Sequence, residues 1–486
     1  MQSVAEDNRK PPYDEVLVKI ADYILDTKID SSIAYDTARL CLMDSLGCAI
    51  LALKFPECRK LIGPIVKGAV LPGGARVIGT HFELDPVQAA FNIGALIRWI
   101  DFNDTWLAKE WGHPSDNLGA ILALADYLSR ERVRAKQPPV TVQQILTLMI
   151  KAYEIQGIMA LDNSFNKVGL DHVILVKLAS AAVASHLLGA NKDQVLRTLS
   201  LVFVDGQSLR TYRHSPNAGS RKSWAAGDAT SRAVRLALLA NLGEMGYPSA
   251  LSAKTWGFYA VSFKGQQFNL SRPFGSYVME NILFKLSYPA EFHAQTAVEC
   301  AVKLYPTVKD RLDEIDRIEI HTHESAIRII SKEGPLHHPA DRDHCLQYMV
   351  AIGLIYGNLT AEHYEDALAK DPRIDALREK MQVFEDKQYS QDYLAADKRS
   401  IANRIQIFFT DNTASDPISS EYPIGHLRRR KEGIPILAEK CRANLATMFK
   451  DEQIDKMLSP FTSVDKLASY SVDRFMTLWS LPQESF

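Results

Sequence analysis

The chain has 486 residues, which at roughly 100–200 residues per domain predicts two or three domains and a large buried core. Hydrophobic residues make up 47% of it and charged residues 23%, as in ordinary globular proteins. The formal net charge of -2 gives no bulk reason to bind nucleic acid or an anionic membrane. We therefore expect neither kind of partner.

Cysteine usage and the chain ends bear on the compartment. The six cysteines form no C-x-x-C pair, which favours small buried side chains in a reducing compartment and argues against an iron–sulfur cluster. No apolar run reaches the ~20 residues that cross a bilayer. Residues 1–15 lack a signal-peptide stretch and include Glu6 and Asp7, and residues 483–486 match no address signal. We expect a cytoplasmic protein, or a mitochondrial-matrix protein if the source is eukaryotic and a presequence has been removed.

The pattern of residues 13–270 is helical. Residues 34–53 are apolar nearly all round, as in a central helix. Strands do not alternate with helices and no GxGxxG motif occurs, so a dinucleotide-binding fold is not expected. We predict a helical domain whose first part spans residues 1–274. In residues 86–100, small residues stand where close helix packing needs them: Ala89, Ala90, Gly94 and Ala95.

The pattern changes after residue 275. Residues 317–323 and 405–411 alternate between apolar and polar, which predicts strands, and residues 341–357 and 372–384 predict helices. We predict a smaller α+β lid domain over residues 275–412. Residues 413–486 return to a helical pattern and would complete the helical domain. The predicted fold class is therefore mainly α, with a large all-helical domain and a smaller α+β lid domain.

Three segments share one design, in which ionisable side chains come just before, or in the first turn of, a helix of small residues. The helices are expected from about residues 116, 173 and 223, with Ser115 and Asp171 as N-cap candidates for the first two. The ionisable residues are Asp101, Asp104 and His113 in the first segment, Asp171 and His172 in the second, and Arg210, Arg213, Arg221 and Lys222 in the third.

Helix N-termini expose unpaired N–H groups and partial positive charge, so they bind anions and favour neutral imidazole. Cations are unfavourable there, so Arg221 and Lys222 break a local rule, as functional residues do. The plainer interpretation makes each histidine a polar residue near a cap, the Asp101/Asp104 pair a turn, and the basic residues surface charge. Because the design recurs three times, we favour a site for a polyanionic small molecule.

Other histidines are weaker candidates. His293 falls in the first turn of a predicted helix, His321 and His323 would share one face of a strand, and His337–His338 is a doublet. The run from Asp341 to His344 opens a predicted helix of the lid domain. No ligand spacing supports a metal site, and no G-x-S-x-G elbow supports Ser-His-Asp catalysis. The basic run within residues 421–433 lacks interleaved aromatic residues, which favours a subunit or domain contact over a nucleic-acid site.

Long stretches of this sequence carry a specific resemblance. They are residues 89–106, 112–122, 169–180, 205–238, 243–251, 274–281, 339–351 and 421–430. Together these stretches resemble the MmgE/PrpD family, and in particular its dehydratase branch. The resemblance implies a helical domain and an α+β lid with the active site between them, in a homodimer that needs no metal, iron–sulfur cluster or other cofactor. It implies a hydro-lyase that removes water from 2-methylcitrate, a tricarboxylate, to give 2-methyl-cis-aconitate.

The resemblance also implies site residues. The related cis-aconitate decarboxylases have their active-site residues in the motifs that hold Asp101, Thr105, His113, His172, Lys222 and Lys285 here. Their lid tyrosine has no match in this chain. His338 departs from the asparagine that precedes Pro-Ala in dehydratases, which leaves the substrate detail open.

From these positions we predict roles. His113 and His172 form the acid/base pair, without an assignment of which is which. Asp101 orients and charges a neighbouring histidine, and Thr105 donates a hydrogen bond. The substrate carboxylates are held by cationic side chains: Lys222, Lys285, Arg210 or Arg213, and Arg342.

Three alternatives stay open. The chain could dehydrate a longer alkylcitrate in a secondary pathway, or decarboxylate cis-aconitate to itaconate. It could also be a non-catalytic scaffold that binds anions. The presence of all six motif residues argues against the scaffold, and the motif set is closer to dehydratases than to decarboxylases.

Overall fold

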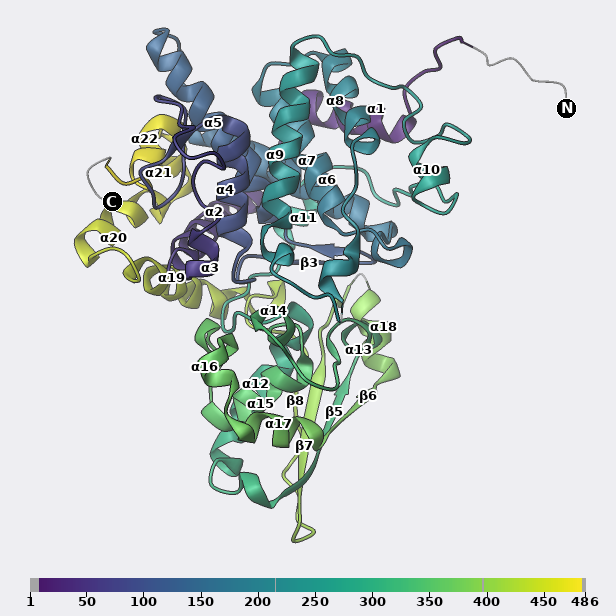
Figure 1. Ribbon diagram of the computed structural model, residues 1–486, viewed down its shortest axis with the longest axis vertical. Coiled ribbons are helices and arrows are strands. Elements are labelled where there is room, and N and C mark those ends of the chain that lie inside the picture. The colour runs from purple at the N-terminus through teal and green to yellow at the C-terminus, as the bar shows by residue number, and fades with distance from the viewer. Residues whose placement is uncertain (1–7, 215, 396, 483–486) are drawn as a thin grey trace, which may run out of the picture.

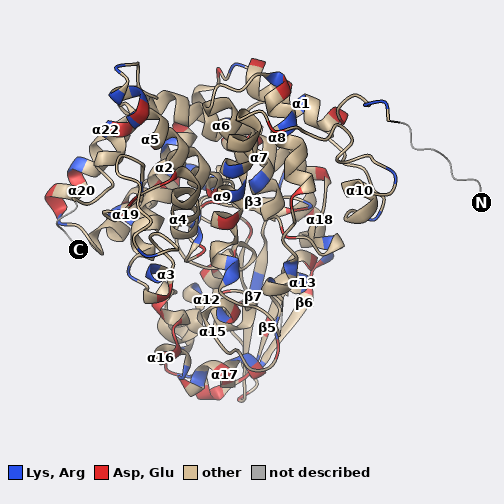
Figure 2. Cartoon of the chain, turned by 45° about the horizontal axis from the view of Figure 1, so that its top comes forward, with Lys and Arg blue, Asp and Glu red and all other residues tan. Residues whose placement is uncertain are grey.

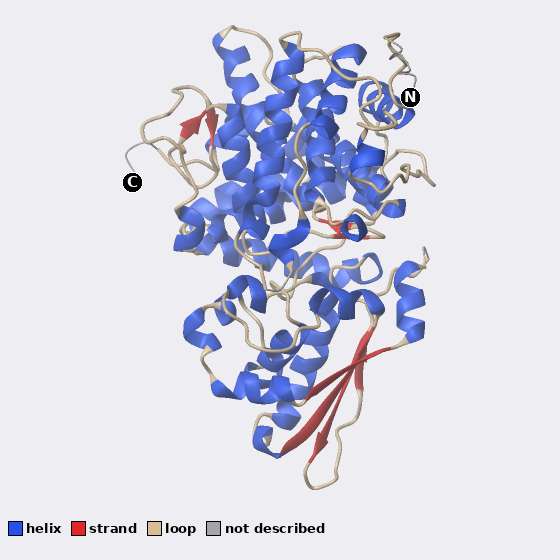
Figure 3. Cartoon of the chain, turned by 45° about the vertical axis from the view of Figure 1, so that its right-hand side comes forward, coloured by secondary structure: helices blue, strands red, loops and turns tan. Residues whose placement is uncertain are grey.

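A computed structural model of the chain describes residues 8–214, 216–395 and 397–482. Glu6, Asp7 and residues 483–486, which entered the expectations about targeting, lie outside the described residues. Figures 1 and 3 show a large helical part and, below it, a smaller part that contains the four-stranded sheet. The predicted mainly α fold with a smaller α+β domain is confirmed.

The helical part surrounds a bundle of long helices. Its helices from the first 280 residues are α1 (Glu15–Asp26), α2 (Ser32–Ala52), α3 (Pro56–Arg59), α4 (Pro86–Arg98), α5 (Leu118–Arg134), α6 (Val142–Asp162), α7 (Val173–Leu187), α8 (Lys192–Val204), α9 (Arg221–Asn241), α10 (Phe258–Val261) and α11 (Tyr277–Glu280). Two short hairpins, β1 (Ala75–Arg76) with β2 (Glu83–Leu84) and β3 (Trp106–Leu107) with β4 (Trp111–Gly112), complete it. The end of the chain adds α19 (Arg430–Ala446), α20 (Asp451–Leu458), α21 (Val464–Ala468) and α22 (Val472–Thr477).

Small residues let the central helices approach closely, as the sequence predicts. A Cβ atom added to Gly94 in α4 would lie 2.8 Å from the Cα of Gly227 in α9, and one added to Gly119 in α5 would lie 3.0 Å from the Cα of Gly94. Real Cβ atoms do not come so near a neighbouring backbone. The three helices therefore pack closely at these glycines, which bring the C-terminal end of α4 next to the N-terminal ends of α5 and α9.

The α+β part is built on one mixed sheet. Its strands lie in the order β6 (Met381–Glu385), β5 (Ile315–Thr322), β7 (Asn403–Phe409), β8 (Ile418–Ser420), with β5 parallel to β6 and antiparallel to β7. The predicted strands over 317–323 and 405–411 correspond to β5 and β7. The helices of this part are α12 (Gln295–Val308), α13 (Glu324–Ile330), α14 (Pro339–Arg342), α15 (Leu346–Tyr356), α16 (Asp366–Ala369), α17 (Pro372–Glu379) and α18 (Lys387–Leu394).

One predicted helix is partly wrong. The expected helix over residues 372–384 ends at Glu379, and its last residues form the edge strand β6. These residues form a strand because they pair with β5, which is distant in sequence and stabilises the half-buried edge strand.

Two hydrophobic cores underlie the two parts. The first extends from Leu17 to Leu286 and takes in Leu437 and later residues of the C-terminal segment, so the end of the chain packs on the helical part. The second extends from Ala290 to Phe409. The domain boundaries at 274 and 412 remain predictions. All six cysteines are buried and free.

The basic run at 421–433 joins the two parts. Arg429 contacts Glu299 of α12, and Arg430 donates to the carbonyl oxygen of Ile282 at 2.6 Å. The expected domain contact is therefore present. Within the described residues, no helix has both the length and the apolar character that a membrane span requires.

Candidate active site

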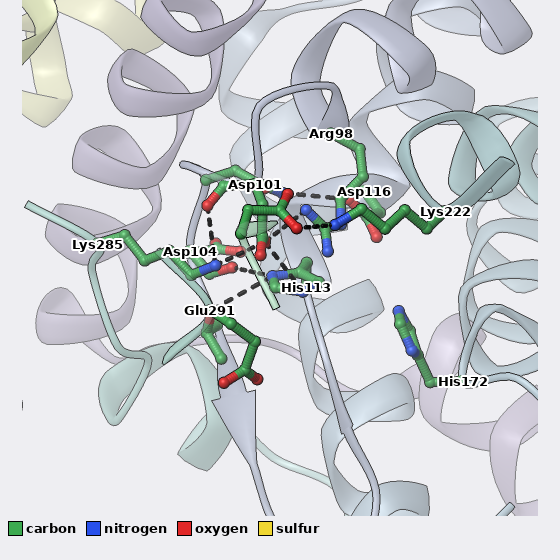
Figure 4. A network of polar contacts seen from close by, with 12 residues as sticks. Arg98, Asp101, Asp104, His113, Asp116, His172, Lys222, Lys285 and Glu291 are labelled. Carbon is green, nitrogen blue, oxygen red and sulfur yellow. Dashed lines mark hydrogen bonds and ion pairs between the residues drawn. The ribbon is translucent and has the colours of Figure 1, made fainter. Parts of the chain in front are cut away.

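Three helix N-termini meet where the two parts of the molecule join. His113 precedes the 3-10 turn η1 (Pro114–Asn117) that leads into α5, His172 precedes α7, and Lys222 lies in the first turn of α9. All three side chains are buried, and the rings of His113 and His172 are 5.8 Å apart. Figure 4 shows the ammonium groups of Lys222 and Lys285 reaching one cluster from opposite sides. Charged segments also lie inside the molecule near β3 and α9 (Figure 2).

Neither predicted N-cap residue is at the N-cap position in the two histidine segments. The N-cap position of α7 is held by His172 and not by Asp171, although Asp171 Oδ1 accepts from the backbone N–H of Val173 at 3.2 Å. Ser115 is not a helix cap, because η1 intervenes before α5. Its hydroxyl instead donates to Asp104 Oδ1 at 2.7 Å.

Asp101 has a strained backbone at the centre of the cluster. Its φ is +51°, in the left-handed region that costs a residue other than glycine on the order of 1–3 kcal/mol. Arg98 donates to its Oδ1 at 2.5 Å, and Lys285 donates to Oδ1 at 2.6 Å and to its carbonyl oxygen at 2.9 Å. Burial opposes ionisation, but Arg98 and Lys285 hold the pKa of Asp101 well below its usual range. Asp101 is therefore a fixed, buried negative charge.

His113 is anchored in one tautomer. Its Nδ1 lies 2.8 Å from the carbonyl oxygen of Asp104 and 3.2 Å from the hydroxyl of Thr105. Because a carbonyl oxygen can only accept, Nδ1 carries the proton and Nε2 has a free lone pair. Burial and the nearby Arg98 hold the pKa of His113 well below its usual range. Nε2 lies 3.6 Å from Asp101, which would stabilise the imidazolium once Nε2 takes a proton.

His172 is buried with unmet hydrogen-bonding capacity. Among the residues that the structure describes, neither ring nitrogen has a hydrogen-bond partner, although Asp171 Oδ1 lies 3.5 Å from Nδ1. Burial, with Arg213 and Arg210 nearby, holds the pKa of His172 well below its usual range. An unsatisfied buried polar group costs about 1–3 kcal/mol, so this imidazole is set up for a ligand.

Arg210 and Arg213 contact Asp171. Arg213 donates to both carboxylate oxygens of Asp171, and Arg210 lies 3.5 Å from one of them and stacks on Trp111. The pKa of Asp171 is lowered, because these guanidinium groups outweigh its burial. The two arginines therefore contact Asp171, whose carboxylate lies beside His172.

Lys222 links the helical part to the α+β part. Its ammonium donates to Asp343 and lies 3.0 Å from Nδ1 of His344. The same Nδ1 also lies 2.9 Å from Asp343 Oδ1, so Lys222, Asp343 and His344 form one compact polar cluster. Burial lowers the pKa of Lys222 to about 8 despite Asp343, and that of His344 to about 4. Lys222 also borders a cavity of about 340 Å³ between the two parts, with Trp99, His338 and Asp343.

Arg98 was not predicted from the sequence, and Asp343 and His344 were only weaker candidates. Arg98 lies in the last turn of the apolar helix α4, and a single arginine in an apolar helix was the sequence signal that could have revealed it. Asp343 and His344, next to the predicted Arg342, contact Lys222. Arg342 itself donates to the carbonyl oxygen of Tyr364 at 2.6 Å and pairs with Asp366, and within the described residues nothing joins it to the cluster. Arg221 pairs with Asp228 instead.

The weaker histidine candidates lie elsewhere. The expectation that His321 and His323 share a strand face is wrong, because β5 ends at Thr322. His321 packs on Phe384, whereas His323 is buried beside His293. His338 of the doublet lies 3.7 Å from Asp341. The described residues contain no group of three or more His, Cys, Asp or Glu side chains placed to hold a metal ion.

Comparison with known proteins identifies the family. The MmgE/PrpD N-terminal domain matches residues 18–271, and the MmgE/PrpD C-terminal domain matches residues 288–459. The chain belongs to the MmgE/PrpD family. It is 59% identical to the 2-methylcitrate dehydratase of Escherichia coli K12, over 97% of this chain and 98% of that protein. It is 58% identical to the 2-methylcitrate dehydratase of Cupriavidus necator (97% and 98%), and 56% identical to the mitochondrial 2-methylcitrate dehydratase of Yarrowia lipolytica (99% and 92%).

Proposed function

We propose that this member of the MmgE/PrpD family removes water from 2-methylcitrate to give 2-methyl-cis-aconitate. The similarity to dehydratases over almost the whole chain carries this proposal. The site supports it, because two neutral imidazoles and two ammonium groups surround one buried cluster. That set of groups suits a tricarboxylate that must lose a proton and a hydroxyl.

The proposed reaction is an elimination. A neutral imidazole takes the proton from the carbon that bears the methyl group, the electron pair forms the new double bond, and the C–O bond on the neighbouring carbon breaks. The second imidazole becomes protonated when the substrate carboxylates lie beside it and raise its pKa, and it then gives this proton to the departing hydroxyl, which leaves as water. His113 and His172 fill these two roles, each contributing on the order of 10²–10⁴-fold. Lys222 and Lys285 hold the carboxylates and stabilise the charge that develops on the enolate-like intermediate.

The remaining residues position these groups. Asp101 fixes Lys285 and faces His113, while Thr105 lies beside the protonated nitrogen of His113. Asp171, held by Arg210 and Arg213, does for His172 what Asp101 does for His113. Arg342 has its own partners in the α+β part, so the proposed site does not use it.

An ultraviolet assay tests the function. Formation of the conjugated double bond is followed with citrate, 2-methylcitrate and longer alkylcitrates, with a chelator present. We expect turnover to be fastest with 2-methylcitrate, and loss of at least about 10²-fold in kcat for His113→Ala and for His172→Ala. Near wild-type turnover in both folded variants would refute the assignment. Release of carbon dioxide from cis-aconitate in place of dehydration would favour the decarboxylase alternative. A lack of activity on every substrate would favour the non-catalytic scaffold.

We also propose that the chain forms a homodimer. In the helical part, large apolar side chains line one surface cavity of about 520 Å³ although they are more than half exposed: Val204, Leu209, Trp256 and Val261. Such a patch marks an interaction site. Trp256→Asp is expected to convert a dimer into a monomer in light scattering, and a monomeric wild type would refute the proposal.

We propose the cytoplasm as the location, or the mitochondrial matrix for a eukaryotic source, since a relative from Yarrowia lipolytica is mitochondrial. Cell fractionation tests this.

A further inference from the structure

A buried lysine from the C-terminal segment reaches the back of the candidate site. Lys440 of α19 has a relative exposure of 7%, and its partner Asp44 in α2 one of 1%. The ammonium of Lys440 donates to the carbonyl oxygens of Phe102 and Lys285, each at 2.6 Å, and forms an ion pair with Asp44 Oδ1 at 2.7 Å. It also lies 3.8 Å from the centre of the Phe102 ring. The ammonium is therefore enclosed by two backbone carbonyl oxygens and one carboxylate.

The two carbonyl oxygens belong to the segments that carry Asp101 and Lys285. Phe102 directly follows Asp101, whose φ is positive, and Lys285 donates to Asp101 twice. These segments are also joined by backbone hydrogen bonds between Thr105 and Leu283 in both directions. The ammonium of Lys440 thus holds the backbone at Phe102, next to Asp101, and at Lys285. The side chains of Asp101 and Lys285 in turn hold each other.

Stability alone does not account for this arrangement. Taking two charges out of water costs several kcal/mol per ion, and apolar replacements of buried ion pairs are often neutral or stabilising. Asp44 raises the pKa of Lys440 despite its burial, so the lysine stays charged. A strained residue such as Asp101 persists only where the structure around it over-determines its backbone. Lys440 supplies such a constraint to the residue after Asp101.

We propose that Lys440 is a positioning residue for the dehydration reaction. It holds the backbone of Phe102 and Lys285 so that the Asp101 carboxylate faces His113 and the Lys285 ammonium faces the substrate. Its action is through Asp101 and Lys285, because its ammonium is buried against these two carbonyl oxygens and Asp44. The proposal rests on the proposed function for its kinetic readout.

Lys440→Met removes the three donors and keeps the chain length. Lys177→Met is a matched control, because Lys177 is also a buried lysine of the helical part and donates to Asp205 Oδ2 and to the carbonyl oxygens of Asp205 and Gly206. A misplacement of about 1 Å costs on the order of 10²-fold in rate. We expect kcat to fall about 30–100-fold in Lys440→Met and less than about threefold in Lys177→Met.

Binding separates positioning from general damage. The affinity for tricarballylate, a tricarboxylate without the hydroxyl, is expected to fall by no more than about tenfold in Lys440→Met, because Lys285 shifts but Lys222 is untouched. An equal loss in both lysine variants, or affinity that falls in step with kcat, would overturn the proposal. So would a kcat above half the wild-type value.

Two further measurements keep the proposal testable if Lys440→Met unfolds. The double variant Asp44→Asn, Lys440→Met leaves no unpaired buried charge, so it should fold and show the same loss of kcat. Wild-type kcat in the folded double variant overturns the proposal.

Nitrogen NMR of labelled histidine reports the Nδ1–H tautomer of His113 without any turnover. We expect that signal in wild type and Lys177→Met and its loss in the Lys440 variants, and its retention would overturn the proposal. If the wild type does not dehydrate 2-methylcitrate, the function fails, and the NMR result still decides the role of Lys440.

Discussion

Two buried histidine pairs lie in this chain, and they differ in how well their polar atoms are satisfied. In the helical part the rings of His113 and His172 are 5.8 Å apart, and in the α+β part those of His293 and His323 are 5.3 Å apart. His293 donates from Nδ1 to Glu291 at 2.8 Å, and its Nε2 lies 3.0 Å from the hydroxyl of Tyr393. Against this, both nitrogens of His172 lack a hydrogen-bond partner within the described part of the chain.

The difference shows which property marks chemistry. Burial and proximity are shared by the two pairs, so neither identifies a catalytic group. Unmet hydrogen-bonding capacity, in a cluster with several cations, occurs around His172 and leaves room for a substrate's oxygens. His323 also has one unmatched nitrogen, Nε2, but its ring stacks on Tyr393 at 4.7 Å with an interplanar angle of 11°. We interpret the second pair as part of the packing between Tyr393 and Glu291.

The largest expected effect comes from replacing one histidine of each pair with phenylalanine. His172→Phe should lower kcat by about 10²–10⁴-fold without loss of stability, because it removes unsatisfied polar atoms. His293→Phe should leave kcat per folded molecule within about threefold, but lower the free energy of unfolding by about 3–5 kcal/mol, since Glu291 loses its partner. Turnover and urea unfolding measure both. If His293→Phe abolishes turnover in a stable protein, the proposed difference between the two histidine pairs is wrong.

Local signals were enough to predict much of the fold and half of the site. Helix periodicity and small residues predict α4, α5, α7 and α9, and the residues at their N-termini include His113, His172 and Lys222. Alternation predicts β5 and β7 because each has one face in the second core. The edge strand β6 was missed because a partner distant in sequence stabilises it.

What a side chain contacts could not be predicted in the same way. Arg210 and Arg213 have the right chemistry for substrate carboxylates, yet they contact Asp171, about 40 residues earlier in the chain. Asp343 and His344 meet Lys222 across 121 and 122 residues. Residue type gives the chemistry that is available, whereas the partner depends on how the two parts of the molecule come together.

The cation beside the first pair should give the site a pH dependence. The pKa of Lys222 is about 8, so its ammonium is present below that pH and is lost as the pH rises through it. We expect kcat/KM for 2-methylcitrate to fall about tenfold per pH unit above this value, since the free enzyme then lacks a cation for a carboxylate. Arginine stays charged at this pH, so Lys222→Arg should lower the activity but remove most of the fall of kcat/KM with rising pH. If Lys222→Arg leaves the fall of kcat/KM above this pH unchanged, another group causes that fall.

A smaller effect is expected from the carboxylate that occupies Lys222. Asp343 and a substrate carboxylate compete for the same ammonium, so Asp343→Asn should tighten tricarballylate binding by about three- to tenfold, up to about 1.4 kcal/mol. Asp366→Asn is the control, because Asp366 pairs with Arg342 away from the cluster. Calorimetry measures both affinities. Weaker binding in Asp343→Asn would mean that the pair with Lys222 shapes the site and does not compete for it.

The smallest effect concerns the satisfied pair. Tyr393→Phe removes the hydroxyl that lies 3.0 Å from His293 and keeps the ring that stacks on His323. A neutral hydrogen bond contributes about 0.5–1.5 kcal/mol, so the free energy of unfolding should fall by about that much. The kcat should stay within about twofold of wild type, because the hydrogen bonds from Glu291 through His293 to Tyr393 do not include His113 or His172. A larger loss of kcat at unchanged stability would show that the second pair moves protons as well, and burial with proximity would then be enough to mark catalytic histidines in this protein.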